Sequence, residues 1–308
     1  MSEAIVGYTG FVGQNLCISH HFDAKYNSKN ISEAYETKPD LLVYSGVRAE
    51  MFTANNFPER DFAHIQEAIS NIEKIKPKRL VLISTISVYP VYEGNENTDI
   101  KDKTGTVYGK NRRYLEQWVE KNITDYTIVR LPALYGEGIK KNFIYDIIHY
   151  IPFLLKEQKF EELFTESNLR YLYENRGDGF YKCIATTQEE KAVLRTFFER
   201  TGFSALNFTD SRSEYQYFNL ENLWNIIRLA TDNDIKKLTI ATEPIKSSEL
   251  YEYIYGKTFL NEILNSYPVQ RLKSVHAELF GGKDGYLYGK EELLQDIKSF
   301  IENQKRND

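Results

Sequence analysis

Three glycines near the start of the chain, spaced as GxxGxxG, constrain the fold more than any other feature. They follow the apolar run Ala4-Ile5-Val6, and a helical pattern opens directly after them. A helix N-terminus presents unpaired backbone N–H groups and a partial positive charge, which suits a pyrophosphate. We expect Gly7 to make the turn, Gly10 to let the backbone approach phosphates, and Gly13 to let the helix pack on the strand. The same glycines would also serve a tight turn alone, so the motif needs support from elsewhere.

The first half of the chain alternates strand patterns with helix patterns. Strands separated by helices indicate βαβ units and a parallel sheet. Ligands of such sheets bind at the carboxyl ends of the strands, where the glycine turn, Gly46, Thr85 and the loop after Arg130 fall. The segments with apolar runs or helical spacing are 39–46, 60–75, 79–85, 107–121 and 126–131.

The pattern changes beyond Tyr135-Gly136, where charged and tyrosine-rich segments extend over 140–213. Further on, the spacing predicts a helix at 218–231, a strand at 236–244 and a helix at 290–303. We therefore predict an α/β fold, with a Rossmann-like doubly wound parallel sheet and a smaller, discontinuous C-terminal substrate lobe. The dinucleotide-binding domain is expected at 1–135, rejoined by about 214–243, and the lobe at 136–213 and 244–308.

Composition limits the function classes. With 42% hydrophobic residues among 308, the chain can bury a sizeable core. No apolar run approaches the ~20 residues that span a bilayer, and the start lacks a secretory pattern, so a cytoplasmic location is expected. Cys17 and Cys183 form no CxxC pair, which indicates neither a disulfide framework nor a metal site. A net charge of −5 argues against a nucleic-acid partner.

A tyrosine and an arginine lie four residues apart at the start of the predicted helix 107–121, so they share one face. They are Tyr108 and Arg112, and Thr85 ends the preceding strand. A cation beside a phenol favours tyrosinate, so we expect Arg112 to lower the pKa of Tyr108 toward neutrality. Thr85 would hold a substrate oxygen while Tyr108 gives or takes its proton. Alone, the pair is more commonly a packed tyrosine beside a surface arginine.

Four stretches occur together in the order and spacing of one family. They are GYTGFVG at 7–13, STISVY at 84–89, YGKNR at 108–112 and VRLPALYGEG at 129–138. On these motifs the chain resembles the extended short-chain dehydrogenase/reductases, also called the NAD-dependent epimerase/dehydratase family. The resemblance is close as far as the YGEG stretch and loose in the later lobe. It implies a catalytic set of Thr85, Tyr108 and Arg112.

Arg112 is the one serious departure from the family pattern, because it stands at the position of the family's lysine. That lysine contacts the nicotinamide ribose and helps to activate the tyrosine. Arginine keeps the charge but is longer and planar. Our interpretation is that Arg112 serves in place of the lysine. A slowed enzyme, or a site without redox chemistry, is the alternative.

The resemblance also implies a pyridine nucleotide cofactor, NADP or NAD. We favour NADP slightly, because no acid follows the second strand, placed near 22–27, and Ser28 and Lys29 there suit a 2′-phosphate. A polar surface loop is the alternative. The expected cofactor contacts are Gly7, Gly10, Phe11, Val12, Gly13, Ser28, Lys29, Ser45, Gly46, Tyr108, Arg112 and Leu131.

Extended members of the family mostly act on nucleotide-linked sugars, which implies such a substrate here. Ser87, Asn142 and Arg271 are its candidate contacts. Dehydratases of the family carry an Asp-Glu pair after the active hydroxyl, whereas Ile86-Ser87 follow Thr85, so dehydration is disfavoured.

The expected activity is a ketoreductase that passes hydride to a sugar ketone with Tyr108 as proton donor, in polysaccharide biosynthesis. An NAD-dependent epimerase and a non-catalytic dinucleotide-binding sensor or scaffold are the alternatives. The resemblance further implies a homodimer through the helices at 60–75 and 107–121.

Overall fold

The computed structural model of the chain describes residues 2–100 and 105–307, which form two compact units. Unit 1 comprises Met1–Ile139, Glu214–Ile245 and Pro268–Leu293, and unit 2 comprises Lys140–Ser213, Lys246–Tyr267 and Leu294–Asp308. The sequence-based boundary places all of 244–308 in the later lobe, but Pro268–Leu293 belongs with unit 1. The reason is strand pairing over a long sequence separation: β15 (Arg271–Leu272) lies parallel to β5 (Glu93–Gly94) of unit 1.

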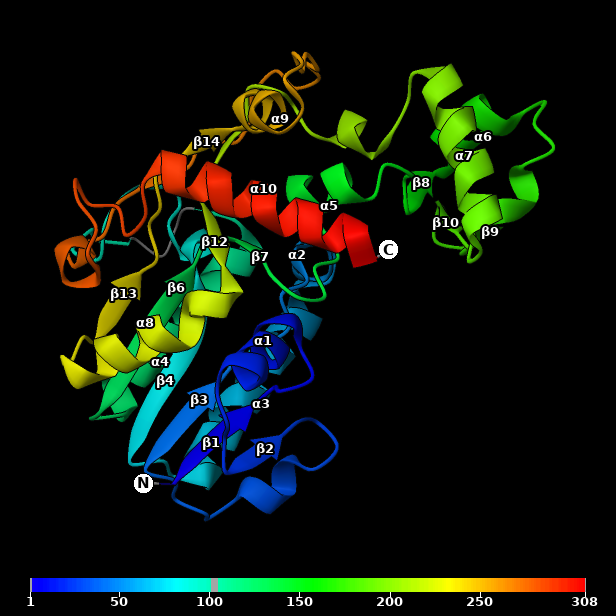
Figure 1. The fold of residues 1–308 in the computed structure, drawn as a ribbon. Coiled ribbons are helices and arrows are strands. Elements are labelled where there is room, and N and C mark those ends of the chain that lie inside the picture. The colour runs from blue at the N-terminus through cyan, green and yellow to red at the C-terminus, as the bar shows by residue number, and fades with distance from the viewer. Residues whose placement is uncertain (1, 101–104, 308) are drawn as a thin grey trace. The chain divides into compact units, whose positions relative to one another are not determined.

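Six parallel strands form the central sheet of unit 1, in the order β13-β6-β4-β3-β1-β2 (Figure 1). Their bounds are β1 Glu3–Val6, β2 Ala24–Tyr26, β3 Leu41–Tyr44, β4 Arg79–Thr85, β6 Tyr126–Leu131 and β13 Lys237–Thr239. The predicted doubly wound parallel sheet is thereby confirmed. The chain steps from β1 to β2 in one direction and from β3 to β13 in the other. The topological switch point therefore falls between β1 and β3.

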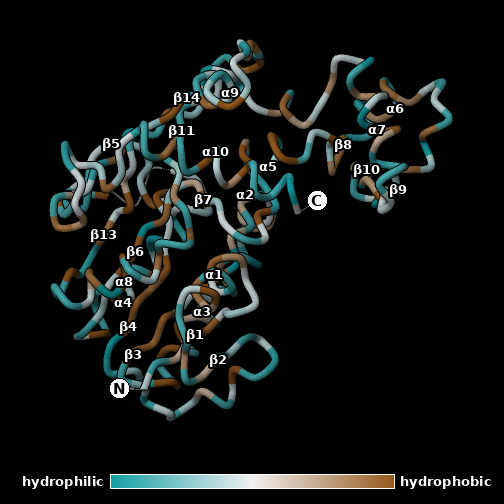
Figure 2. Tube along the Cα trace, viewed as in Figure 1, coloured by the Kyte–Doolittle hydropathy of each residue, from teal (hydrophilic) through white to brown (hydrophobic). Residues whose placement is uncertain are grey.

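Helices cover both faces of this sheet, because successive strand residues point to opposite sides. Ile5 and Val81 pack with α1 (Phe11–Ser19) and α8 (Leu223–Asp232) on one face. Ala4, Val6 and Leu80 pack with α3 (Pro58–Ile75) and α4 (Val107–Asn122) on the other. Figure 2 shows the central strands mainly in the brown of hydrophobic residues, as strands buried on both faces should be.

Shorter elements of unit 1 shape the carboxyl end of the sheet. The predicted helix at 218–231 starts later than expected, because β12 (Tyr217–Asn219) pairs in parallel with β7 (Ala133–Tyr135) before α8 begins. The predicted strand at 236–244 is confined to β13. The other elements are η1 Ile31–Ala34, α2 Met51–Asn56, η2 Ile86–Val88, β11 Glu214–Tyr215, η5 Leu220–Asn222 and η6 Ala277–Phe280.

Unit 2 contains the tyrosine-rich segments, which form an aromatic core around a three-stranded antiparallel sheet, β8-β10-β9. Aromatic ring contacts dominate this core, and the rings of Phe160 and Tyr181 stack at a centroid distance of 3.7 Å. Its elements are α5 Phe143–Ile148, β8 Leu154–Lys156, α6 Glu157–Phe164, η3 Arg170–Leu172, β9 Tyr173–Asn175, β10 Phe180–Cys183, α7 Gln188–Thr201, η4 Ala205–Phe208 and α9 Ser247–Tyr255. Two elements, β14 (Ile245–Lys246) and α10 (Lys290–Asn307), contribute residues to both units.

Within the part of the chain that the structure describes, no helix combines the length and apolar character needed to cross a bilayer.

Candidate functional site

The glycine turn joins β1 to α1 beside the switch point. Gly7 has a φ of +91°, and a Cβ there would lie 2.7 Å from the backbone of Ser45 and Gly46. A Cβ on Gly13 would lie 2.2 Å from the carbonyl oxygen of Gly7. At Gly10, by contrast, a Cβ would meet only that same oxygen, at 3.3 Å. The tight turn therefore has no room for side chains at Gly7 and Gly13. Gly10 is less crowded, which leaves its backbone accessible to a ligand.

Helix α1 begins at Phe11, and no side chain caps its N-terminus, because Gly10 occupies the N-cap. Its first turn also contains no acidic residue. The amide groups and partial positive charge of this helix end thus adjoin the glycine cradle. This combination fits a dinucleotide pyrophosphate, and the predicted contacts of Phe11 and Val12 with it stay predictions.

Hydrogen bonds fix the neighbouring strand ends around the turn. The backbone N and the Oγ of Ser45 both donate to the carbonyl of Val6 at 2.9 Å, which holds the Ser45–Gly46 loop against the turn. The backbone N of Gly7 donates to Tyr26 in β2 at 2.8 Å. The carboxyl ends of β1, β2 and β3 are therefore locked together.

The predicted residues for a 2′-phosphate, Ser28 and Lys29, are exposed in the turn that follows β2. Two asparagine side chains close this turn: Asn30 accepts from the backbone N of Asn27 at 2.8 Å, and Asn27 accepts from that of Lys29 at 2.9 Å. This arrangement orders the backbone while the side chains of Ser28 and Lys29 stay at the surface.

Asn15 is a positioning residue that the sequence reasoning missed. Its buried amide donates to the carbonyl of Glu137 at 2.9 Å and accepts from the backbone N of Glu137 at 3.0 Å. A Cβ on Gly136 would lie 2.7 Å from the Asn15 oxygen, so the close approach requires glycine. The YGEG loop is thus held against α1. Beside it lies a hollow of about 470 Å³, lined by Tyr8, Thr9, Gln14, Cys17, Ile18, Glu137 and Gly138.

The structure brings Thr85, Tyr108 and Arg112 together. Thr85 ends β4, and Tyr108 lies in the first turn of α4, whose N-cap is Thr106. The side chains of Thr85 and Arg112 lie close enough to the hydroxyl of Tyr108 for hydrogen bonding to lower its pKa. The guanidinium carbon of Arg112 lies 4.4 Å from the centroid of the tyrosine ring. A hydroxyl, a phenol and a cation are therefore in contact at the carboxyl end of the sheet.

Gly109 makes this contact possible. A Cβ at that position would lie 1.9 Å from the carbonyl oxygen of Ser87, so no side chain fits between α4 and η2. The backbone of Ser87 also donates to the Oγ1 of Thr85 at 3.2 Å. The glycine of the YGKNR motif therefore brings Tyr108 close to Thr85.

The expectation that Arg112 lowers the pKa of Tyr108 toward neutrality is wrong. Burial in the unit raises the pKa of Tyr108 above its usual value and outweighs the lowering by the charge and hydrogen bond of Arg112. The carboxylate of Asp61 raises this pKa further. Tyr108 is therefore a protonated phenol at neutral pH.

Asp61 was not predicted from the sequence, although it carried a signal. It lies on the buried face of α3 with Ile65, Ala68 and Ile72, where an acid interrupts the apolar stripe. In the structure it forms a buried ion pair with Arg112, with 3.1 Å between Oδ1 and Nη2. An ionisable residue at a core position of a helix is the pattern that would have identified it.

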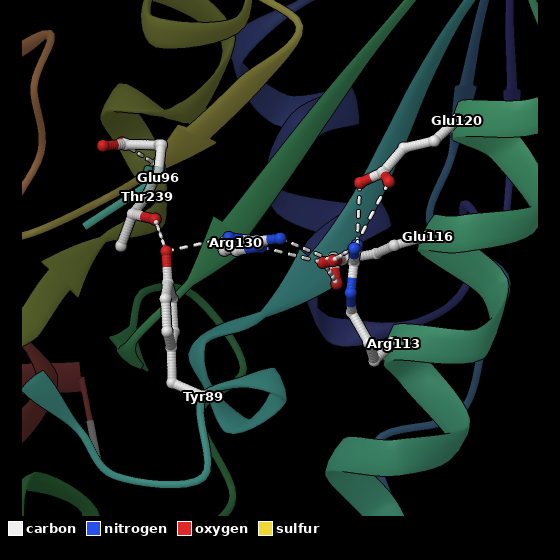
Figure 3. A network of polar contacts seen from close by, with 8 residues as sticks. Tyr89, Glu96, Arg113, Glu116, Glu120, Arg130 and Thr239 are labelled. Carbon is white, nitrogen blue, oxygen red and sulfur yellow. Dashed lines mark hydrogen bonds and ion pairs between the residues drawn. The ribbon is translucent and has the colours of Figure 1, made fainter. Parts of the chain in front are cut away.

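A second buried network lies farther along α4 (Figure 3). Glu116 is fully buried and receives both Nε and Nη2 of Arg130, at 3.0 and 2.7 Å. Arg130 also donates to the hydroxyl of Tyr89 at 2.8 Å. Burial works to lower the pKa of Arg130, but the charge and hydrogen bonds of Glu116 outweigh it and raise that pKa. Arg130 is therefore a charged structural residue inside the core.

This network continues on both sides of Arg130 and reaches the candidate site. The hydroxyl of Tyr89 contacts that of Thr239 at 2.9 Å, and Glu96 accepts from the backbone N of Thr239 at 2.7 Å. On the other side, Glu116 accepts from Ser84 at 2.6 Å. Ser84 directly precedes Thr85, so the buried charges anchor the strand end that carries the hydroxyl of Thr85.

The remaining predicted site residues have separate environments. Leu131 pairs in register with Thr85, and Ser87 lies in η2, so both adjoin the site. Arg271 forms an ion pair with Glu214 at 3.0 Å and is about half exposed. Asn142 lies in unit 2, where its oxygen caps α5 by accepting from the backbone of Ile144 and Tyr145. Their contacts with substrate stay predictions.

The predicted dimer surface also stays a prediction. Helices α3 and α4 pack side by side, with the rings of Phe62 and Tyr114 5.1 Å apart. Trp118 packs against the core, whereas Tyr114 is exposed. Across residues 2–100 and 105–307, no three His, Cys, Asp or Glu side chains are grouped so as to hold a metal ion.

Comparison with known proteins identifies one similar family model and several similar solved structures. Residues 7–153 match the family model described as the RmlD substrate binding domain. No curated protein matches the sequence. Three solved structures share the fold over nearly the whole length of both chains, although sequence identity is low.

The first is dTDP-4-dehydrorhamnose reductase from Bacillus anthracis in complex with NADP, with a TM-score of 0.63, 13% identity, and coverage of 98% of this chain and 99% of that one. The second is RMD from Pseudomonas aeruginosa complexed with NADPH, with a TM-score of 0.62, 12% identity and 100% coverage of both chains. The third is UDP-glucose 4-epimerase from Thermotoga maritima with UDP-glucose, with a TM-score of 0.61, 14% identity, and coverage of 100% and 99%. At such identities the likeness establishes the fold.

Proposed function

We propose that this chain is an NADPH-dependent ketoreductase of a nucleotide-linked sugar, of the extended short-chain dehydrogenase/reductase type. The observation that carries the proposal is the contact of Tyr108 with Thr85, in the same unit as the glycine cradle. The structures with NADP and NADPH support the cofactor, and the nucleotide sugars in the names of two relatives support the substrate class.

The chain's own residues would perform the proton half of this reaction. When bound, the nicotinamide cofactor would supply the hydride for the carbonyl carbon of the sugar. The hydroxyl of Thr85 donates a hydrogen bond to the ketone oxygen and orients it. Tyr108, protonated because burial raises its pKa, gives its proton to that oxygen and completes the alcohol.

Oxidation of NADPH in the presence of a panel of nucleotide-linked 4-keto sugars tests the proposal. Net oxidation with at least one member is the expected result. A protein without measurable affinity for NADPH or NADH would overturn both the activity and the cofactor assignment.

Epimerisation is the second candidate, supported by the fold shared with a UDP-glucose 4-epimerase. An epimerase must first oxidise a sugar hydroxyl, which needs Tyr108 as a base. The raised pKa of Tyr108 works against that step, so reduction is favoured. Conversion of a UDP-sugar without net change in the cofactor would favour the epimerase instead.

Lys29→Glu is expected to reverse the cofactor preference. Lys29 is exposed beside the end of β2, and its charge suits a 2′-phosphate. Loss of a charge-assisted contact weakens NADPH binding by about 1.5–3 kcal/mol, which is at least roughly tenfold. Affinity for NADH should change little. Fluorescence titration of both nucleotides gives the measurement.

Lys121→Glu is the matched control, because this exposed lysine in the last turn of α4 undergoes the same charge change. It should leave the NADPH:NADH affinity ratio as in the wild type. Equal weakening of both nucleotides by Lys29→Glu would contradict a role in binding the 2′-phosphate.

A further inference from the structure

The guanidinium of Arg112 is held by groups that a lysine side chain could not satisfy together. Its Nη1 donates to Oδ2 of Asp61 at 3.2 Å, and its Nη2 donates to Oδ1 at 3.1 Å. Nη2 also donates to the carbonyl of Arg48. This two-pronged geometry requires a planar fork, which an ammonium group lacks. The arginine at the family's lysine position and the buried acid on α3 therefore form a matched pair.

The ion pair of Asp61 and Arg112 is buried and lies beside the ring of Tyr108. Side chains of Asp61 and Arg112 are 3% and 5% exposed, so solvent screens their charges weakly. Asn111 donates to Oδ2 of Asp61 at 2.8 Å, which orients the carboxylate. The guanidinium carbon lies 4.4 Å from the Tyr108 ring centroid. Asp61 therefore sets both where the cation lies and how much of its field reaches the phenol.

Among the described residues, two charges act on Tyr108. Arg112, one of several cations on α4, lowers its pKa, and Asp61 on α3 opposes that effect. Of the other elements that pack on α4, η2 and α2 contain no ionisable residue. The strands β4 and β6 carry Arg79 and Arg130, whose charges are paired with Asp125 and Glu116. Thr85 contributes an uncharged hydroxyl. The protonation of Tyr108 thus depends on burial and on the balance between Arg112 and Asp61.

We infer that Asp61 is a positioning residue: it clamps Arg112 beside the ring of Tyr108, offsets its charge, and so keeps Tyr108 a proton donor. The inference rests on the proposed function, because it concerns the direction of proton transfer at the same site. With its cation neutralised, the site suits protonation of a ketone oxygen rather than removal of a proton from an alcohol. The raised pKa of Tyr108, to which Asp61 contributes, agrees with this role.

The test is an ultraviolet titration of tyrosinate in the cofactor-free protein. Subtracting the titration of Tyr108→Phe from that of the wild type isolates Tyr108 among the 23 tyrosines. The same subtraction is then made in an Asp61→Asn background. Because Arg112 is left unopposed, the midpoint of Tyr108 should fall by about one pH unit. The alkaline limb of kcat for ketone reduction should fall with it, while KM for NADPH changes less.

A double variant, Asp61→Asn with Arg112→Gln, keeps the test decisive if the single variant does not fold. It replaces the buried ion pair by two neutral amides, a change that cores tolerate better than loss of one partner. If Asp61 offsets Arg112, the midpoint should stay within about half a unit of the wild type. A rise of about one unit or more would show that Arg112 acts unopposed, and would overturn the inference.

Asp125→Asn is the matched control. It breaks another ion pair of unit 1, with Arg79 at 2.7 Å, and should leave the Tyr108 midpoint in place. A folded Asp61→Asn protein with an unchanged midpoint would reduce Asp61 to a structural role. The titration needs neither cofactor nor substrate, so a protein that reduces no sugar can still show the shift. That result would reject the proposed function and retain the role of Asp61 toward Tyr108.

Discussion

Tyr108→Phe is expected to lower kcat for NADPH-dependent ketone reduction by about 10²–10⁴-fold, the usual contribution of a positioned acid. The phenylalanine ring keeps the packing against Arg112 but has no proton to give to the ketone oxygen. Nucleotide affinity should stay close to that of the wild type, because the glycine cradle and the Ser28–Lys29 turn are untouched. Stopped-flow turnover and a separate NADPH binding titration give the two measurements.

The same reaction has a predictable pH dependence. Burial raises the pKa of Tyr108 above the usual value of a tyrosine, so the acid form is present throughout the neutral range. Proton donation should therefore persist as pH rises and decline only above that value. A decline of kcat through pH 7 to 8 would instead indicate a tyrosine activated by its cation, as the sequence alone predicted.

Tyr114→Phe provides the control for this substitution. It removes the same hydroxyl from an exposed position on the same helix, and activity should stay at the wild-type level. Retention of wild-type turnover by Tyr108→Phe would show that the proton comes from another group.

Glu116→Gln is expected to destabilise the fold by about 3–5 kcal/mol, the usual effect of removing one partner of a buried ion pair. Glu116 is fully buried, and its carboxylate accepts from Arg130, Arg113 and Ser84. The neutral amide leaves the charge of Arg130 uncompensated in the core and presents an N–H₂ group where donors already point. Urea unfolding followed by circular dichroism gives the loss of stability.

Glu120→Gln is the control that separates the effect of burial on stability from the effect of losing a carboxylate charge. Glu120 lies one turn farther along α4, accepts from Arg113 at 2.7 Å, and is about one quarter exposed. Its substitution should cost less than about 1 kcal/mol, because water screens the pair and solvates the arginine. Equal losses for the two variants would mean that the buried network contributes no more than a surface ion pair.

The buried network also connects stability with the site. Glu116 holds Ser84, and the next residue, Thr85, contacts Tyr108. A hydroxyl that must orient a ketone oxygen needs a rigid strand end. The fully buried charges of Arg130 and Glu116 supply that rigidity at the cost of desolvation.

Local pattern was enough to predict most of the sheet. The strand at 79–85 and the helix at 60–75 were predicted close to their observed bounds, because apolar runs and helical spacing report directly on burial. The helix predicted at 218–231 begins too early, because its first residues belong to a strand that pairs with residues far away in the sequence. Pairing over such separations leaves no local pattern.

The sequence by itself determined the glycine turn, the parallel α/β order, and the placing of Thr85 and Tyr108 at strand and helix ends. Each of these follows from short-range spacing and from backbone geometry. Only the tertiary structure decided the protonation of Tyr108, because burial and an acid 47 positions earlier, Asp61, outweigh the neighbouring cation. Likewise, only folding brought Glu116, Arg130 and Tyr89 into one network. Electrostatic balance in a dry interior depends on distances in space, which spacing along the chain does not encode.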